Sequence, residues 1–114
     1  MRLVIVESPW AARDVQSKAK HLRYAIAAMR DSLGRLEAPL ASHVLYAASG
    51  VLDDRVAKER AEGIAAGFAW RAKAELVAAY IDLGISPGMR HAIDDAERAG
   101  IPVEYRNVPI WTEF

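Results

Sequence analysis

The 114-residue sequence contains no cysteine, which excludes a disulfide framework and any zinc or iron–sulfur site built on thiolates. It also lacks an apolar run of the roughly 20 residues that a membrane helix requires. The short apolar start, residues 3–6, does not have the length of a signal peptide. From these absences we expect a cytoplasmic protein.

An excess of charge of one sign is missing as well. Lys plus Arg and Asp plus Glu each number 15, and the two signs are interspersed, so the chain has no basic stretch of the kind that binds nucleic-acid phosphates. Three histidines, His21, His43 and His91, lie on separate predicted elements without an i, i+4 pair, so a zinc site has no support. We expect no metal, no cofactor, no nucleic-acid partner and no membrane partner.

What is present is the composition of a folded domain. Hydrophobic residues make up 53% of the chain and charged residues 26%, without a repeat, a linker or a low-complexity stretch. A chain of this length builds one core. We therefore predict a single domain over residues 1–114, with the apolar tail, residues 110–114, docked on the core or on a second subunit.

Four apolar stretches predict β-strands: residues 3–6, 42–46, 76–81 and 102–105. The first is rich in β-branched residues and is followed by Glu7-Ser8-Pro9, which is typical of a buried parallel strand that ends in a loop. The second rests on the β-propensity of His43-Val44-Leu45-Tyr46.

Three segments with helical periodicity alternate with these strands. Asp14 caps the first over residues 15–33, Asp53 or Asp54 caps the second through about Lys73, and Ser86 with Pro87 begins a third that stops at Gly100. Each has one apolar face that we expect to be buried. These faces are Leu22, Ile26, Met29 and Leu33 in the first helix; Ala57, Ala61, Ile64 and Phe68 in the second; and Met89, Ala92, Ile93 and Ala96 in the third.

Alternation of strand and helix predicts an α/β fold: a three-layer sandwich in which a four-stranded parallel sheet carries helices on both faces, of the flavodoxin or Rossmann type. With so few strands the expected order is 2-1-3-4. Ligands of such sheets bind beyond the carboxyl ends of the strands, where the strand order reverses. The two loops at that point are residues 7–13 and 82–89.

The second of these loops is equipped for an anionic ligand. Gly84 and Gly88 let a ligand approach the backbone, and the helix that Ser86 caps presents free N–H groups at its positive end. A phosphate or a sugar hydroxyl would fit there, although the same residues also serve as an ordinary helix start. Asp82 at the same strand end and Glu7 across the cleft favour a site, because carboxylates at such a position hold hydroxyls or metals.

Five motifs together resemble the nucleoside 2-deoxyribosyltransferase-like superfamily, and more closely a branch of small bacterial and phage proteins within it. The motifs are Glu7-Ser8-Pro9-Trp10, Ser42-His43-Val44-Leu45-Tyr46, Val51-Leu52-Asp53-Asp54, Glu59-Arg60 with Gly63-Ile64 and Ala69-Trp70, and Tyr80-Ile81-Asp82-Leu83-Gly84-Ile85-Ser86-Pro87-Gly88-Met89. The resemblance covers nearly the whole chain. It implies a nucleoside- or nucleotide-processing domain that cleaves or transfers an N-glycosidic bond, working as a homodimer or a higher homo-oligomer.

The resemblance also implies roles for single residues. Asp82 matches the aspartate beside the attacking carboxylate, and Ser86 and Gly88, followed by Met89, match the turn that contacts sugar or phosphate. The loop Ser8-Pro9-Trp10 matches the one that closes over the base. In such enzymes a carboxylate forms a glycosyl-enzyme intermediate and divides one difficult displacement into two easier ones.

At the position of that attacking glutamate, six residues beyond Ser86, this chain has Ala92, which cannot attack. Asp94 is rotated by about 200° from it around the helix, whereas Asp95 returns to the same side roughly 4.5 Å further along. Glu59, early in the second helix, is the third candidate. Each of the three also fits an ordinary solvated helix charge.

Three further residues are candidates for ligand contact. His43 lies at a predicted strand end within a matched motif, and Trp10 in the first loop either stacks on a base or packs in the core. Arg60 is a candidate phosphate contact. It cannot point in the same direction as its neighbour Glu59, so a shared role requires tertiary help.

Other functions remain open beside the glycosidic one. A nucleotide-binding module without catalysis, a sensor or a sequestering protein, accepts Ala92 as it stands. A Toprim-type metal-dependent domain shares the start of the chain through Glu7, but it requires an Asp-x-Asp pair, and the sequence has only the adjacent pairs Asp53-Asp54 and Asp94-Asp95. A phosphoreceiver domain would use Asp82, but it also requires a fifth strand with a lysine.

Overall fold

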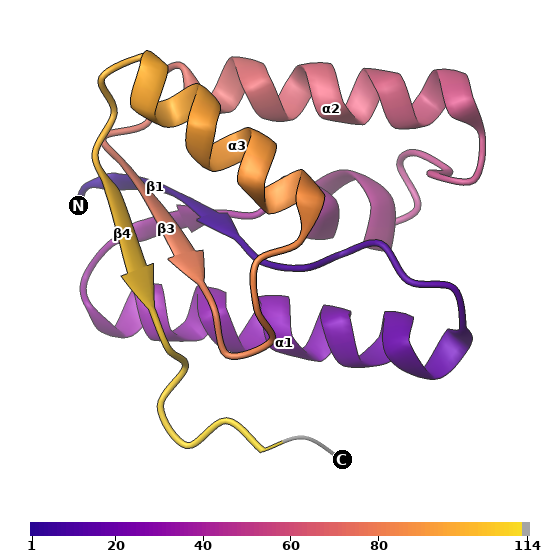
Figure 1. The fold of residues 1–114 in the computed structure, drawn as a ribbon, viewed down its shortest axis with the longest axis horizontal. Coiled ribbons are helices and arrows are strands. Elements are labelled where there is room, and N and C mark those ends of the chain that lie inside the picture. The colour runs from indigo at the N-terminus through magenta and orange to yellow at the C-terminus, as the bar shows by residue number, and fades with distance from the viewer. Residues whose placement is uncertain (113–114) are drawn as a thin grey trace.

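A computed structural model describes residues 1–112, which form one α/β domain with a parallel four-stranded sheet in the order β2-β1-β3-β4 (Figure 1). The strands are β1 (Leu3–Glu7), β2 (Ala38–Leu40), β3 (Leu76–Tyr80) and β4 (Val103–Arg106). The predicted fold class and the predicted order 2-1-3-4 are confirmed. Because the strands are parallel, their carboxyl ends share one edge of the sheet, where Glu7 of β1 pairs in register with Ala79 of β3.

Helices cover both faces of the sheet. Helix α1 (Val15–Gly34) lies on one face, and α2 (Ala57–Arg71) and α3 (Pro87–Arg98) lie on the side of the other (Figure 1). Side chains of a strand alternate between the two faces. In β1, Val4 and Val6 accordingly join the core with α1, while Ile5 packs with Ala96 of α3.

Two helix starts follow their sequence signals. The carboxylate of Asp14 accepts a hydrogen bond from Ser17 N at 2.7 Å, and the hydroxyl of Ser86 accepts one from Met89 N at 3.2 Å, with Pro87 in the first turn. Gly100 follows α3 with a φ of 76°, a conformation that favours glycine. The predicted inner face of α3 is confirmed, because all of its members are buried: Met89, Ala92, Ile93 and Ala96.

The predicted second strand was wrong. Strand β2 is residues 38–40, earlier in the chain, and His43–Ala48 form a single π-helical segment, η1. Pro39 lies within β2 opposite Val4. A proline cannot donate to a ladder, but β2 is an edge strand and tolerates it. Pairing with β1 therefore overrides the β-propensity of residues 43–46.

The predicted buried face of α1 was wrong in part: Leu22 and Met29 are half-buried, and Met29 packs against the core. Ile26 and Leu33 are exposed, and the face toward the sheet consists of Tyr24, Ala25, Ala28 and Ser32. Two of these are small, so the helix backbone can approach the sheet closely, and the polar groups of Tyr24 and Ser32 have hydrogen-bond partners.

For α2, neither the cap nor the buried face matches the prediction. Val56 occupies the N-cap position without a side-chain hydrogen bond, whereas Asp53 pairs with Arg55 and Asp54 accepts from Trp10. The predicted buried residues Ala57, Ala61, Ile64 and Phe68 are all exposed. Only Gly67 and Arg71 of this helix are buried.

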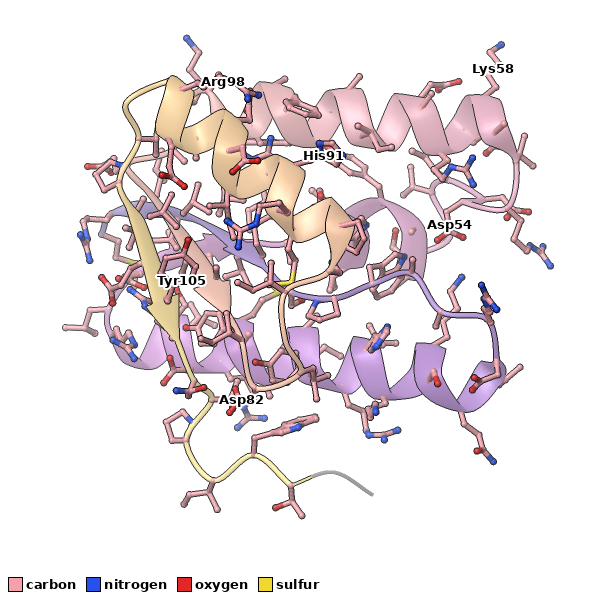
Figure 2. All side chains as sticks on the ribbon, viewed as in Figure 1. Asp54, Lys58, Asp82, His91, Arg98 and Tyr105 are labelled. Atoms are coloured by element: carbon pink, nitrogen blue, oxygen red, sulfur yellow. The ribbon has the colours of Figure 1, made fainter. Side chains whose placement is uncertain are left out.

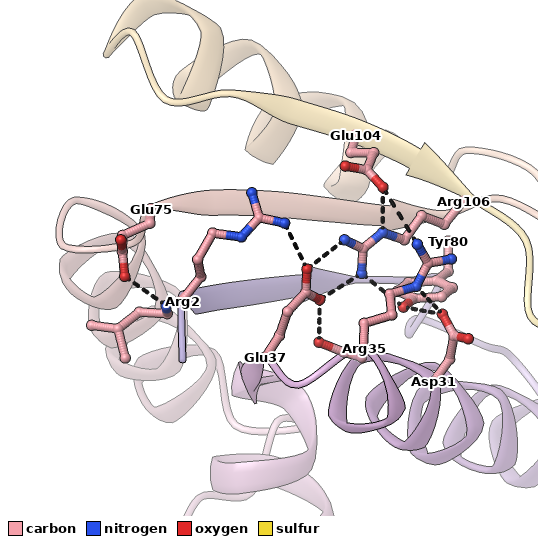
Figure 3. A network of polar contacts seen from close by, with 10 residues as sticks. Arg2, Asp31, Arg35, Glu37, Glu75, Tyr80, Glu104 and Arg106 are labelled. Carbon is pink, nitrogen blue, oxygen red and sulfur yellow. Dashed lines mark hydrogen bonds and ion pairs between the residues drawn. The ribbon is translucent and has the colours of Figure 1, made fainter.

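A buried polar network joins the end of α1 to the beginning of β2 and the end of β4 (Figure 3). Arg106 donates to both carboxylate oxygens of Glu37 at 2.8 Å, and Ser32 Oγ donates to Glu37 at 2.8 Å. Tyr80 accepts from Arg106 at 3.2 Å and donates to Asp31 at 2.7 Å. The hydrogen bonds that Glu37 accepts, from Arg106 first and then from Ser32 and Arg2, lower its pKa to about 2.

Trp111 docks on the core, which is one of the two placements that we predicted for the tail. Its ring meets that of Tyr24 edge-on, with 4.8 Å between the ring centroids, and the preceding Val108 is buried. Ile110 points to solvent, and Glu113 and Phe114 lie outside the described residues. Within residues 1–112 no helix has both the length and the apolar character to cross a membrane.

Candidate functional site

A cavity of about 510 Å³ lies at the carboxyl edge of the sheet, between the loop after β1, η1, α2 and the start of α3. Nine of the residues that the sequence marked as site candidates line it: Glu7, Ser8, Trp10, His43, Glu59, Arg60, Ser86, Gly88 and Met89. The two loops at the reversal of strand order therefore meet at one cavity, together with a wall from α2.

Five other candidates do not line the cavity. Pro9 is buried beside it, and Gly84 makes a turn with a φ of 85°. Asp94 lies 3.9 Å from Arg90 on the surface of α3, and Asp95 contacts Arg71.

Asp82 is the fifth, and it holds the C-terminal segment. Its Oδ2 accepts hydrogen bonds from the Tyr24 hydroxyl at 2.6 Å and from Val108 N at 2.7 Å. Figure 2 shows Asp82 next to the C-terminal segment and well apart from Asp54, which lines the cavity. Placing Asp82 beside a ligand in this cavity would require both of its hydrogen bonds to break.

Glu7 is the buried carboxylate of the cavity. Only 8% of it is exposed, and its Oε2 lies 3.3 Å from Nη2 of Arg71, the buried last residue of α2. Nη1 of Arg71 in turn lies 3.2 Å from Asp95. Burial raises the pKa of Glu7, and the positive charge of Arg71 opposes that rise without cancelling it. Glu7 thus exchanges its proton closer to neutral pH than an ordinary glutamate.

Trp10 and His43 form a stacked pair at the cavity wall. Their ring centroids lie 5.3 Å apart with an angle of 2° between the planes. The indole N–H of Trp10 donates to Asp54 at 2.9 Å, and the residue is buried, so packing is its main role. His43 is the exposed member of the pair. Partial loss of water lowers the pKa of His43 against the influence of Asp54, so its ring is neutral at pH 7.

The η1 segment explains how His43 reaches this wall. In a strand, His43 and Leu45 would point to the same side, but the helical turn directs His43, Tyr46 and Ala47 to the cavity instead. The hydroxyl of Tyr46 accepts a hydrogen bond from the indole of Trp70 on α2 at 2.7 Å. Single π-helical turns are frequent at functional sites.

Positive groups also line the cavity. The N-terminus of α3, with Ser86 and Gly88, contributes its dipole there. Lys18 and Arg55 are compensated by Asp54 and Asp53 at 3.4 and 3.0 Å. Arg60 has no carboxylate partner among the described residues, so its charge is available to an anionic ligand.

Four residues that shape the site escaped the sequence analysis: Lys18, Tyr46, Asp54 as a wall residue, and Arg71. Asp54 and Tyr46 lie in matched motifs, which was a usable signal. Arg71 had no such signal, because its contacts with Glu7 of β1 and Asp95 of α3 join segments that are far apart in the chain. Across residues 1–112 the structure contains no group of three or more His, Cys, Asp or Glu residues that could hold a metal ion.

Comparison with curated proteins and with solved structures finds no significant match. Residues 2–106, nearly the whole chain, match the family model described as Domain of unknown function (DUF7768). The protein is therefore a member of the DUF7768 family.

Proposed function

We propose that the cavity binds a nucleoside or nucleoside 5′-monophosphate and that Glu7 acts on its N-glycosidic bond. The observation that carries the proposal is Glu7 itself: among the described residues, it is the buried carboxylate that lines the cavity. Its raised pKa is typical of carboxylates that do chemistry. A homodimer, which the resemblance also implies, belongs to the same proposal.

Three features of the cavity support a nucleotide as the ligand. Its volume of about 510 Å³ lies within the range of small-molecule sites. His43 offers a neutral ring on which a base can stack. Arg60 and the N-terminus of α3 together suit a phosphate group.

Glu7 supplies the carboxylate that position 92 lacks. Ala92 is buried against the core with 3% of its surface exposed, so no side chain there can reach a ligand. An oxygen of ionised Glu7 would form a bond to the anomeric carbon, and the bond from that carbon to the base nitrogen would break. The base leaves with the electron pair and takes a proton from solvent. Water, or a second base, then displaces the carboxylate and releases the sugar.

Binding without turnover is the second candidate function, and a specific observation favours it. The resemblance assigns Asp82 to the neighbourhood of the attacking group, yet Tyr24 and Val108 hold it outside the cavity. A chain that has Ala92 and a distant Asp82 retains the binding cavity without two of the usual catalytic groups. Such a module would bind nucleotide stoichiometrically.

The test is chromatographic detection of free base after incubation with nucleosides and 5′-monophosphates, with and without added acceptor bases to reveal transfer. Glu7→Gln keeps the shape of the side chain and removes its charge. Glu97→Gln is the matched control, because Glu97 is exposed near the end of α3. Base release by the wild type and the control, lost in Glu7→Gln, supports the proposal.

Titration calorimetry on the same ligands separates the two functions. Binding without base release rejects the glycosidic reaction and leaves the binding module. Absence of both binding and release rejects both functions. Because the attack requires ionised Glu7, base release should increase as the pH rises through the raised pKa of this residue.

A further inference from the structure

Arg71 lies between two carboxylates that come from different elements. Its Nη2 is 3.3 Å from Oε2 of Glu7 at the end of β1, and its Nη1 is 3.2 Å from Oδ2 of Asp95 on α3. A cation–π contact places the guanidinium over the ring of Phe68, with 4.6 Å between Cζ and the ring centroid. Both Arg71 and Glu7 are buried, so water screens the contact between them only weakly.

This contact differs from the buried ion pair of Arg106 and Glu37. There the guanidinium contacts both carboxylate oxygens at 2.8 Å, which is the bidentate geometry of a strong ion pair. Arg71 contacts only one oxygen of Glu7, at a longer distance, and Oε1 accepts no hydrogen bond from any residue that the structure describes. Because Glu7 lines the cavity, Oε1 is the oxygen that remains for a ligand.

We propose that Arg71 is a positioning residue of the glycosidic reaction: it holds Oε2 of Glu7, leaves Oε1 to attack, and stabilises the carboxylate when the sugar departs. This inference rests on the proposed function and adds to it a residue that the sequence analysis did not select. Arg71 does not line the cavity, so it acts through Glu7 and not by contact with the substrate.

The two chemical steps show what the guanidinium contributes. In the first step Oε1 bonds to the anomeric carbon, and the base leaves with the electron pair of the broken C–N bond. Glu7 is then a neutral ester whose carbonyl oxygen, Oε2, still accepts from Arg71. In the second step water attacks the anomeric carbon and loses a proton to solvent, while the electron pair of the C–Oε1 bond returns to Glu7. The guanidinium stabilises this returning charge, so Glu7 leaves more readily with Arg71 than without it.

Asp95 explains how the buried arginine tolerates the loss of charge on Glu7. A buried cation without an anionic partner is strongly destabilising. When Glu7 becomes an ester, Asp95 remains beside Nη1 of Arg71 and keeps the guanidinium paired. Asp95 therefore stabilises the glycosyl-enzyme without contact with the substrate, since it does not line the cavity either.

Rapid-quench measurement of base release separates the two steps, with whichever nucleoside or 5′-monophosphate the wild type cleaves. Each variant is assayed at a pH at which its Glu7 is ionised, so that a changed pKa does not account for a slower rate. In Arg71→Met the first equivalent of base should appear at least as fast as in the wild type. Later turnovers should slow roughly 10- to 100-fold, which is the worth of one charge-assisted hydrogen bond. The sugar should then accumulate on Glu7, detected as a mass increase of the intact protein.

Asp95→Asn should change the steps in the opposite direction. It leaves Arg71 unpaired in the glycosyl-enzyme, so the first release of base should slow and no sugar should accumulate. Arg71→Lys keeps a positive charge and should restore part of the second step. Arg90→Met is the control, because it removes a half-exposed arginine 3.9 Å from Asp94 on α3, and it should leave both steps unchanged.

The outcomes distinguish this inference from the function on which it rests. A wild type that releases no base rejects the glycosidic reaction and the role of Arg71 together. An active wild type with equal effects of Arg71→Met on both steps, or with no effect, overturns the role of Arg71 alone. Should circular dichroism show that Arg71→Met does not fold, Asp95→Asn decides: accumulation of sugar in that variant, or an unchanged first step, overturns the inference.

Discussion

Replacing Glu37 by glutamine removes the negative half of a buried ion pair while keeping the size of the side chain. Glu37 is 3% exposed and Arg106 is 4% exposed, and Arg106 contacts both carboxylate oxygens at 2.8 Å. In the variant the guanidinium stays buried opposite an uncharged amide. Removing one partner of a buried pair typically costs about 3–5 kcal/mol, a large fraction of the roughly 5–15 kcal/mol that stabilises a domain.

The lowered pKa of Glu37 expresses the same interaction as a dependence of stability on pH. Its value of about 2 in the folded protein lies below the ordinary glutamate value of 4.5. That difference corresponds to about 3 kcal/mol of stability at neutral pH. Because the folded pKa is the lower one, this stability is present above pH 4.5 and is lost as the pH falls toward 2.

Urea denaturation followed by circular dichroism, from pH 7 down to pH 2.5, measures both effects. We expect Glu37→Gln to lower the unfolding free energy at pH 7 by about 3 kcal/mol and to lose less stability than the wild type on acidification. Glu104→Gln is the control, because Glu104 also contacts Arg106, at 2.9 Å, but its side chain is 44% exposed. This variant should lower the unfolding free energy by less than about 1 kcal/mol. A loss under 1 kcal/mol for Glu37→Gln, or an acid dependence equal to that of the wild type, would refute this reasoning.

Three further substitutions test the site and its surroundings. Asp82→Asn should lower stability by about 1–3 kcal/mol in urea denaturation, since it weakens charge-assisted hydrogen bonds, yet leave nucleotide affinity unchanged in calorimetry. Arg71→Met should raise the pKa of Glu7 further, measured by carboxyl NMR titration, and an unchanged pKa would contradict the contact. Ser86→Ala removes the N-cap of α3 and should lower the unfolding free energy by about 1 kcal/mol. It should also reduce the affinity for 5′-monophosphates more than the affinity for nucleosides, and an equal reduction would place the phosphate elsewhere.

Local signals were sufficient where a segment interacts mainly with itself. The α3 start needs only a serine followed by a proline, and its inner face follows from the spacing of Met89, Ala92 and Ile93. The two loops that meet at the cavity could be located in the same way, because alternating strands and helices place the strand ends at one edge. Glu7, Ser86 and Gly88 were found by this reasoning.

Long-range packing decided the position of the second strand and the surroundings of Asp82. Residues 43–46 have β-propensity, but β1 pairs with residues 38–40, and the following turn becomes helical and directs His43 and Tyr46 to the cavity. Asp82 sits at a strand end like a site residue, yet a tyrosine from α1 and a backbone N–H after β4 hold it elsewhere. Neither partner is near it in the chain.

The sequence by itself determined the α/β class, the order of the strands, the third helix and the position of the cleft, because periodicity and capping are properties of neighbouring residues. Only the tertiary structure decided which residue supplies the buried carboxylate, that Arg71 contacts it, and that the predicted inner face of α2 is exposed. Burial and charge pairing depend on segments far apart in the chain, so no local pattern contains them.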